Sequence, residues 1–255
     1  KNKYPKSIFI DRSNKNFKEK KFLFTQLNDL TIITVSDWLS KITNRSFLKN
    51  KNRVTIPNGI DINSFYPYQN NNRNVNTLKK YNIKSEKTII GVASVWDNRK
   101  GLEEFIKLRK ILNKEILIIL VGLSKKQIKS LPIGIKGIMK TENIEVLVDL
   151  YNLADVYANL SLEDAFPTTN LEAISCGKPV VTYNTGGSPE SICSETGIVV
   201  EKHNIQKVNS AINLIISKGK NYYLNKCRNK AIKSFDANKC FEEYYNLFVN
   251  SLENR

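Results

Sequence analysis

Two carboxylates stand in the part of the chain where chemistry is easiest to place, residues 161–173 (SLEDAFPTTNLEA). The pattern predicts that a strand ends here and that a helix begins near Thr169. Pro167 is expected near the first helical position, where the missing N–H of a proline costs least. The backbone amides of Thr168 and Thr169 are then free to bind an anion such as a phosphate oxygen.

Glu172 lies within the first turn or so of this predicted helix and is expected to face the same end as those amides. A carboxylate in that place accepts two hydrogen bonds from a vicinal diol such as a ribose. Asp164, eight residues earlier, is placed to hold the hydroxyls of a second sugar. The alternative is that these acids, with Glu163, only complement the helix dipole, and on these residues alone that alternative is favoured.

Two adjacent cations, Arg99 and Lys100, form a second candidate, in a turn between a predicted strand and a predicted helix. The free N–H groups at a helix start already favour anions, so a diphosphate suits this place. A solvent-exposed charged loop is the plainer explanation, and the signal is weak when taken alone.

Paired glycines, Gly186 and Gly187, form a third candidate, in the segment 183–190 (YNTGGSPE) that follows another predicted strand. Glycines let the backbone approach a ligand closely, because they carry no side chain. The alternative is an ordinary glycine-rich loop that ends in a helix start, with Glu190 in its first turn.

Composition excludes several other chemistries. The 255-residue chain has one histidine, His203, which excludes multi-histidine zinc sites, and no serine elbow lies near it for a catalytic triad. The four cysteines show no CxxC spacing, which favours reduced structural thiols of a cytoplasmic protein over a zinc ribbon or a disulfide scaffold. No metal and no cofactor is expected. No apolar run reaches the 18 residues of a membrane-spanning helix.

The net charge of +16 is unevenly distributed. Residues 1–53 hold 13 Lys and Arg against 4 Asp and Glu, a net charge of +9. Such a surface suits nucleic acid, anionic lipid or phosphorylated substrates, and a general lysine-rich bias of the sequence is an equally weighted alternative. The basic residues 1–6 precede no apolar stretch, so no signal peptide is predicted, and the start resembles a chain cut from a longer one.

Strands and helices alternate from Thr88 onward, and repeated βα units of this length predict an α/β fold with a doubly wound parallel sheet. Ligands bind outside the carboxyl ends of the strands in such a sheet, which is where the three candidate segments lie. Before residue 88 the pattern predicts strands at 30–35 and 54–56, a short helix capped by Ser36, and a polar loop or linker at 67–77. The predicted strands of the sheet are 88–93, 115–121, 135–139, 155–160, 179–183 and 197–200.

Taken in order, these motifs resemble those of bacterial family 4 glycosyltransferases of the GT-B fold, above all the members that build capsular, exopolysaccharide or O-antigen repeat units. The resemblance covers nearly the whole chain from about residue 30. Any one motif is weak, whereas six in register are a strong signal. The motifs are VSDWL (35–39), IPNGID with FYP (56–67), KG (100–101), D-x7-E (164–172), CGKPVV (176–181) and GGSPE (186–190).

The resemblance implies two Rossmann-like domains that face a cleft. The C-terminal domain binds a nucleotide-sugar donor, and the N-terminal domain supplies most of the acceptor site. Transfer is metal-independent and retains the anomeric configuration. The implied partners are a nucleotide-sugar substrate, a lipid-linked saccharide acceptor and, through the basic N-terminal segment, an anionic membrane surface at the cytoplasmic face; no nucleic acid is expected.

The family's site residues carry over by motif. Lys100 would contact the diphosphate with help from the amides of Thr168 and Thr169, and Glu172 would bind the ribose. Asp164 would bind the transferred sugar, so that Asp164 and Lys100 are the implied catalytic pair. The remaining implied donor contacts are Phe166 beside the sugar, residues 138–141 near the base (Ile138, Met139, Lys140 and Thr141), and Gly186, Gly187 and Glu190 along the cleft.

This chain departs from the family pattern in three places. The first carboxylate is Asp164, one methylene shorter than the family's glutamate, and Pro167 stands where the family has a glycine. The family also has an arginine about five residues before the lysine of Lys-Gly. Arg99 is the nearest substitute here, and a role for Arg99 as a phosphate ligand is a hypothesis.

Length sets the expected domain organisation. Residues 1–56 would be the remnant of an N-terminal, acceptor-side domain, 57–84 a hinge or linker, 85–235 the Rossmann-like donor domain, and 236–255 a crossover helix. The chain is therefore expected to be a fragment, inactive alone, or one half of a split enzyme with a separate N-terminal-domain partner. A GT-B-fold nucleotide-sugar epimerase and a non-catalytic basic module that binds nucleotide or membrane are the alternatives left open.

Overall fold

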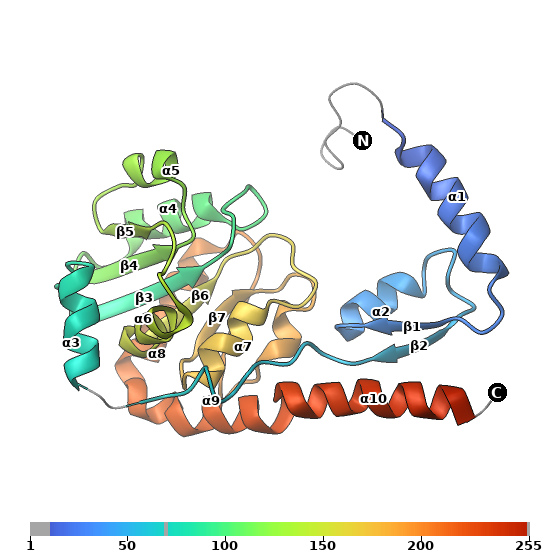
Figure 1. Cartoon of the computed structure of the whole chain (residues 1–255). Coiled ribbons are helices and arrows are strands. Elements are labelled where there is room, and N and C mark those ends of the chain that lie inside the picture. Colours follow the sequence, from blue (N-terminus) through green and yellow to red (C-terminus); the bar gives the residue numbers. More distant parts are fainter. Residues whose placement is uncertain (1–10, 69–70, 254–255) are drawn as a thin grey trace. The chain divides into compact units, whose positions relative to one another are not determined.

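The computed structural model describes residues 11–68 and 71–253, without the side chains of 71–74 (Figure 1). The chain forms two compact units, Lys1–Ile56 and Pro57–Arg255. The predictions made for residues 1–6 and for the most N-terminal part of the basic segment concern residues outside the described range. No helix in the described part of the chain is both long and apolar enough to cross a membrane.

The first unit is a small αβ element. Helix α1 (Ser13–Gln26) precedes two parallel strands, β1 (Thr31–Thr34) and β2 (Asn52–Thr55), with helix α2 (Asp37–Thr43) between them. Ser36 caps α2 as expected, because its side chain accepts a hydrogen bond from the Leu39 amide at 3.2 Å. Helix α1 was not predicted, because the apolar side chains of this helix form no stripe on one face, and Phe22 and Leu23 are exposed.

The second unit contains a six-stranded, wholly parallel sheet, which confirms the predicted doubly wound α/β class. Its strand order is β5-β4-β3-β6-β7-β8. The chain builds from β3 outward to β5, then returns to the other side of β3 with β6 and continues outward to β8. The strands are β3 (Lys87–Val92), β4 (Ile116–Val121), β5 (Ile135–Ile138), β6 (Val156–Asn159), β7 (Val180–Tyr183) and β8 (Gly197–Val200).

Helices flank this sheet in two groups (Figure 1): α4 packs against α8, whereas α6 packs against α3 and α7 against α9. Strand β4 is apolar throughout and β3 is apolar after Lys87 and Thr88, and both are largely buried, as expected for strands covered on both faces. Helices α5 and α9 were not predicted. The helices are α3 (Asn71–Lys80), α4 (Leu102–Ile111), α5 (Lys125–Lys129), α6 (Ile144–Leu153), α7 (Thr168–Ser175), α8 (Ile205–Lys218), α9 (Lys220–Ser234) and α10 (Ala237–Glu253), with a 3-10 turn at Ser188–Ser191.

The prediction of a polar loop at residues 67–77 is wrong, because helix α3 occupies most of that range. Its asparagine-rich sequence is a poor helix former, so packing against α6 must supply the stability. Asp149 of α6 provides the anchor: the Tyr68 hydroxyl donates to one carboxylate oxygen, and the Thr77 hydroxyl donates to the other at 2.8 Å.

Residues 57–68, expected as part of a hinge or linker, pack onto the second unit. The Arg228 guanidinium of α9 donates to the carbonyls of Phe65 at 2.8 Å and Ile62 at 2.9 Å. The Ile60 amide donates to the Phe235 carbonyl at 2.7 Å, and the Ala237 amide returns a bond to Ile60. This segment is therefore held by backbone carbonyls that any sequence would offer, which a residue pattern does not reveal.

Candidate functional site

A cavity of about 670 Å³ opens at the carboxyl ends of β3, β4, β5 and β6. This is the point where the chain order of the sheet reverses, and in doubly wound sheets the loops on either side of such a point separate to leave a crevice. The volume suits a ligand of nucleotide size. The cavity is lined by Val92, Ala93, Ser94, Lys100, Val121, Gly122, Met139, Lys140, Thr141, Leu147, Ser161, Asp164, Phe166, Pro167, Thr168, Thr169 and Glu172.

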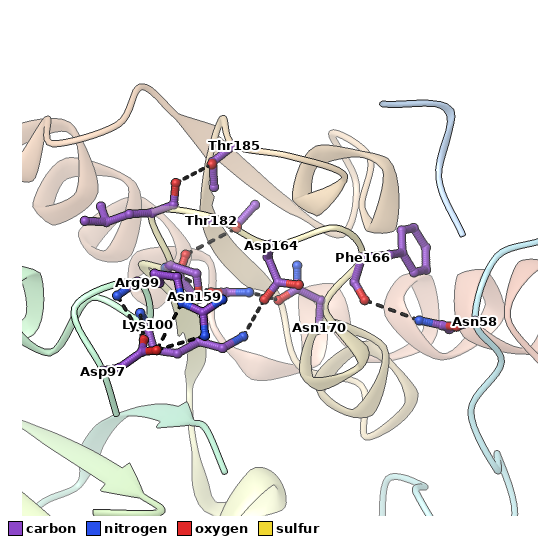
Figure 2. A network of polar contacts seen from close by, with 12 residues as sticks. Asn58, Asp97, Arg99, Lys100, Asn159, Asp164, Phe166, Asn170, Thr182 and Thr185 are labelled. Atoms are coloured by element: carbon purple, nitrogen blue, oxygen red, sulfur yellow. Dashed lines mark hydrogen bonds and ion pairs between the residues drawn. The ribbon is translucent and has the colours of Figure 1, made fainter. Parts of the chain in front are cut away.

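Lys100 and Asp164 form an ion pair at the cavity wall (Figure 2). The Lys100 Nζ lies 2.6 Å from the Asp164 Oδ2, and the side chains are 33% and 13% exposed. Lys100 follows β3 and Asp164 follows β6, so the two strands beside the crevice each present one charge. A ligand that engages either group with an opposite charge or a hydroxyl must compete with this pair.

The backbone around Asp164 is held by the neighbouring loop that follows β7. The Gly187 amide donates to the Asp164 carbonyl at 3.1 Å, and a Cβ on Gly186, whose φ is +56°, would lie 1.7 Å from that same oxygen. The Thr185 hydroxyl donates to the Leu162 carbonyl at 2.7 Å (Figure 2). The paired glycines thus let two loops meet, and they do so beneath Asp164.

The turn that carries Lys100 also depends on a glycine. Gly101 has φ of +76°, and a Cβ there would lie 2.0 Å from the Leu160 carbonyl oxygen at the end of β6. The Leu162 amide donates to the Arg99 carbonyl at 2.6 Å. The loops after β3 and β6 are therefore joined through the backbone, which sets the separation of Lys100 and Asp164.

Helix α7 points its first turn at the cavity. Pro167 is the N-cap residue rather than the first helical residue, a correction of one position, and it gives no side-chain cap. The first backbone amides of a helix have no partner within it, so Thr168 and Thr169 at the cavity wall present donors for an anion. The Phe166 ring, also at the wall, packs edge-on against Phe235 at 5.8 Å.

Glu172 is partly buried at the cavity wall, one turn into α7. The Tyr151 hydroxyl of α6 donates to its Oε2 at 2.8 Å, and in the described part of the chain this is the one hydrogen bond to the carboxylate. Burial raises the pKa of Glu172, and the bond from Tyr151 opposes that rise. The carboxylate therefore keeps hydrogen-bonding capacity for a ligand that reaches the cavity.

The loop after β5 forms the far wall of the cavity. Met139, Lys140 and Thr141 line it, and Met139 is 45% exposed; their contact with a base stays a prediction. Ile138 is buried at the end of β5, and its carbonyl accepts bonds from the amides of Gly122 and Leu123. Ile138 therefore supports this wall from behind.

Other predicted site residues stand apart from the cavity wall. Arg99 is 57% exposed and holds Asp97 through two bonds of 2.9 and 3.0 Å. Gly186 and Gly187 act on the Asp164 backbone, as described, and Glu190 is exposed on the 3-10 turn. The roles carried over from the family remain predictions for all of these residues.

Several wall residues were not predicted as site residues. Ala93 and Ser94 follow β3, Gly122 follows β4, and Ser161 follows β6. All are small residues just past the end of a strand, so strand ends with small side chains were the available clue. Leu147 of α6 also lines the wall, and only the packing of that helix reveals it.

The parallel sheet belongs to a Rossmann-like domain with the fold of GT-B glycosyltransferases. The chain belongs to the glycosyl transferases group 1 family, which matches residues 75–234. The matched range contains every residue of the cavity wall. The family resemblance found in the sequence is thereby confirmed.

Relatives and solved structures agree with this assignment. A Campylobacter jejuni protein, N,N'-diacetylbacillosaminyl-diphospho-undecaprenol alpha-1,3-N-acetylgalactosaminyltransferase, is 24% identical over 83% of this chain and 59% of its own length. A glycosyltransferase structure from Rickettsia africae superposes with a TM-score of 0.81 at 20% identity, covering 98% of this chain and 69% of that one. Anabaena Alr3699/HepE, solved with UDP and glucose, gives 0.77 at 20% identity, covering 93% and 67%.

The chain spans less than two thirds of the length of the curated relatives it matches, for example 59% of the Campylobacter protein and 45% of a Corynebacterium glutamicum mannosyltransferase. The structural likenesses, at 20% identity or less in these cases, show the fold. What the whole protein transfers, and to what, is a matter for proposal.

Proposed function

We propose that this chain supplies the donor-binding part of a retaining glycosyltransferase, which moves a sugar from a nucleotide-sugar donor to a lipid-linked saccharide or a growing cell-surface polysaccharide. One observation carries the proposal. The crevice between β3 and β6 brings together a cation, two helix-start amides and two carboxylates: Lys100, Thr168 and Thr169, and Asp164 with Glu172.

Each group suits one part of a nucleotide sugar. Lys100 and the α7 amides offer positive charge and donors for the diphosphate. Glu172, with capacity left on its carboxylate, accepts from the ribose hydroxyls, and Asp164, once released from Lys100, accepts from hydroxyls of the transferred sugar. The wall formed by Met139, Lys140 and Thr141 is left for the base.

The reaction needs no nucleophile from the chain. The oxygen of an acceptor hydroxyl attacks the anomeric carbon on the face from which the diphosphate departs, and the bond from that carbon to the diphosphate oxygen breaks. The acceptor proton passes to the departing diphosphate oxygen, which leaves a new glycoside and a nucleoside diphosphate. Lys100 and the helix-start amides stabilise the charge that develops on the diphosphate.

The acceptor proposal rests on relatives. The printed name of the Campylobacter protein describes an undecaprenol-linked substrate, and the Anabaena structure holds UDP and glucose. We extend both classes to this chain: a nucleoside diphosphate sugar as donor, and a lipid-linked saccharide at the inner face of the cell membrane as acceptor.

Thermal unfolding with added nucleotide tests the donor proposal. UDP or GDP should raise the melting temperature, because a ligand that binds only the folded state stabilises it by mass action. Lys100→Ala should remove most of that rise, whereas Lys125→Ala, an exposed lysine outside the cavity, should keep it. No rise with either nucleotide, or equal rises in both variants, would contradict the proposal.

Salt separates this site from a charge-driven surface. Binding of nucleic acid through basic residues weakens steeply with salt, because counterions are released. A nucleotide held in the crevice should lose little affinity over the same range. A steep salt dependence would favour the basic-module alternative.

Peripheral attachment to an anionic membrane is proposed for the basic N-terminal segment. In its described part, α1 exposes Phe22 and Leu23 beside a run of lysines. Each basic residue near an anionic surface contributes about 1 kcal/mol. The chain should sediment with vesicles that contain anionic lipid, less so as salt rises; equal sedimentation with neutral vesicles would remove this idea.

A further inference from the structure

Two buried tyrosines lie behind the cavity wall. Tyr151 of α6 is 0% exposed and Tyr157 of β6 is 1% exposed, and their rings lie 5.7 Å apart. Neither belongs to the wall. Their hydroxyls nevertheless reach α7: that of Tyr151 donates to Glu172 at 2.8 Å, and that of Tyr157 contacts the Thr169 side chain.

The Tyr151 hydroxyl is placed to control the carboxylate. A buried tyrosine hydroxyl needs a hydrogen-bond partner, and here that partner is the Oε2 of Glu172. The bond fixes one oxygen of the carboxylate against the protein, which leaves Oε1 as the oxygen with freedom to serve the cavity. A neutral donor also favours the ionised form of the acid that it contacts.

We propose that Tyr151 is a positioning residue of the donor site, which holds the Glu172 carboxylate in the orientation that accepts the ribose diol. The inference rests on the proposed function, and it deepens it by assigning a role to a residue that does not touch the nucleotide. Tyr157 supplies a matched comparison, because it is equally buried and adjacent but makes no bond to Glu172.

The experiment is a cycle between a protein group and a ligand group. Binding of UDP and GDP, and of their 2′,3′-dideoxy counterparts, is measured by calorimetry on the wild-type chain, Tyr151→Phe and Tyr157→Phe. Tyr151→Phe should weaken the ribonucleotide about tenfold and the dideoxynucleotide hardly at all, as expected for one charge-assisted hydrogen-bond network. Tyr157→Phe should leave the preference for ribose unchanged.

The pH dependence gives a second readout that a packing role would not move. The ionisable groups near Glu172 are Tyr151, Tyr157 and Cys176 in the protein and Lys100 and Asp164 across the cavity. Only the first is altered in Tyr151→Phe. The Glu172 carboxylate then loses its hydrogen-bond donor, which raises its pKa. As the pH is lowered, ribonucleotide affinity should therefore begin to fall at a higher pH than in the wild type.

A fluorinated tyrosine at position 151 covers the case in which Tyr151→Phe does not fold. Fluorine makes the hydroxyl a stronger donor and barely changes the shape of the ring, so the acid-side loss of affinity should move to lower pH.

The possible failures are distinct. If the wild-type chain binds neither UDP nor GDP, the proposed function fails. If the wild type prefers ribose and Tyr151→Phe keeps that preference and the same pH profile, the positioning role is overturned while the donor site stands. Equal weakening of both nucleotides by Tyr151→Phe would also overturn it, since that result is expected from packing alone.

Discussion

Glu104 and Glu172 are two glutamates at the carboxyl edge of the same sheet, and each accepts a hydrogen bond from a buried tyrosine. Glu104, in the first turn of α4, is 2% exposed; it accepts from the Tyr183 hydroxyl at 2.5 Å and from Lys107 at 2.8 Å, and the His203 Nδ1 lies 3.3 Å away. Glu172 has Tyr151 alone among the described residues.

The pKa values of the two carboxyls move in opposite directions. Burial acts to raise the pKa of Glu104, but the bonds from Lys107, Tyr183 and His203 outweigh it and hold that pKa below its ordinary value. Burial raises the pKa of Glu172, and one tyrosine does not offset it. A carboxylate satisfied by its own protein serves the fold, whereas one left short of partners beside a cavity is available to a ligand.

The largest expected effect is on binding. Glu172→Ala should weaken UDP or GDP about 100-fold, because up to two charge-assisted bonds to the ribose are lost and each is worth roughly 1.5–3 kcal/mol before desolvation. Calorimetric titration measures this loss. Glu163→Ala is the matched control, an exposed acid on the loop before α7 that does not line the cavity. Unchanged nucleotide affinity in Glu172→Ala would mean that Glu172 only complements the dipole of α7.

The counterpart variant should act on stability. Glu104→Gln should lower the free energy of unfolding by about 2–3 kcal/mol, because the buried network loses the negative charge and one of the two acceptor oxygens that Tyr183 and Lys107 share. Nucleotide affinity should not change, since Glu104 lies outside the cavity wall. Glu103→Gln, the exposed neighbour in the same turn, serves as control in chemical denaturation. A large loss of nucleotide affinity in Glu104→Gln would break the comparison.

The two acids should also respond to pH with opposite signs. The lowered pKa of Glu104 adds stability that is present above its ordinary value and is lost as pH falls through the folded pKa. The raised pKa of Glu172 adds stability that is present below its ordinary value and is lost as pH rises through the folded pKa.

Denaturation of the wild type, Glu104→Gln and Glu172→Gln from about pH 2 to about pH 7 tests this, because the range then includes the lowered pKa of Glu104 and the raised pKa of Glu172, with about 1.4 kcal/mol expected per unit of pKa shift. On acidification, the free energy of unfolding of Glu104→Gln, which is lower than that of the wild type, should approach the wild-type value from below. That of Glu172→Gln, which is higher, should approach the wild-type value from above. Parallel curves for the two variants would contradict the contrast.

The smallest effect is expected from the tyrosine of the satisfied cluster. Tyr183→Phe should cost about 1 kcal/mol of unfolding free energy, since Glu104 keeps its other donors. Nucleotide affinity and its preference for ribose should be those of the wild type. Tyr223→Phe, a buried tyrosine outside both clusters, is the control. A shift in ribose preference would mean that the two clusters are not independent.

The sequence predicted the parallel sheet and much of the cavity wall, because both follow from local patterns. Alternating apolar strands and helices indicate the sheet, and the Asp164 to Glu172 spacing places two acids around one helix start. The contact between Tyr151 and Glu172 could not be predicted in the same way, because it joins α6 to α7 and depends on how two helices pack. For Arg99 the sequence suggested a phosphate contact from its charge alone; in the structure Arg99 pairs with Asp97 two residues earlier, and its role as a phosphate ligand stays a prediction.

Helix α3 was not predicted, for a related reason. Its asparagines favour a loop, and the helix depends on Asp149 far along the chain, which holds Tyr68 and Thr77. Local preference was overruled by distant contacts of buried polar groups. The Glu104 cluster, drawn from α4, β7 and the segment after β8, was likewise absent from any local pattern.

A crystal structure of this chain with UDP or GDP would show whether the crevice between β3 and β6 binds the donor. We expect the ribose hydroxyls to lie within hydrogen-bond distance of the Glu172 carboxylate, and a diphosphate oxygen to replace Asp164 as the partner of the Lys100 ammonium. The 2.6 Å pair between Lys100 and Asp164 should then be broken. A nucleotide bound outside the crevice between β3 and β6, or one whose ribose faces away from Glu172 while that pair stays intact, would contradict this expectation.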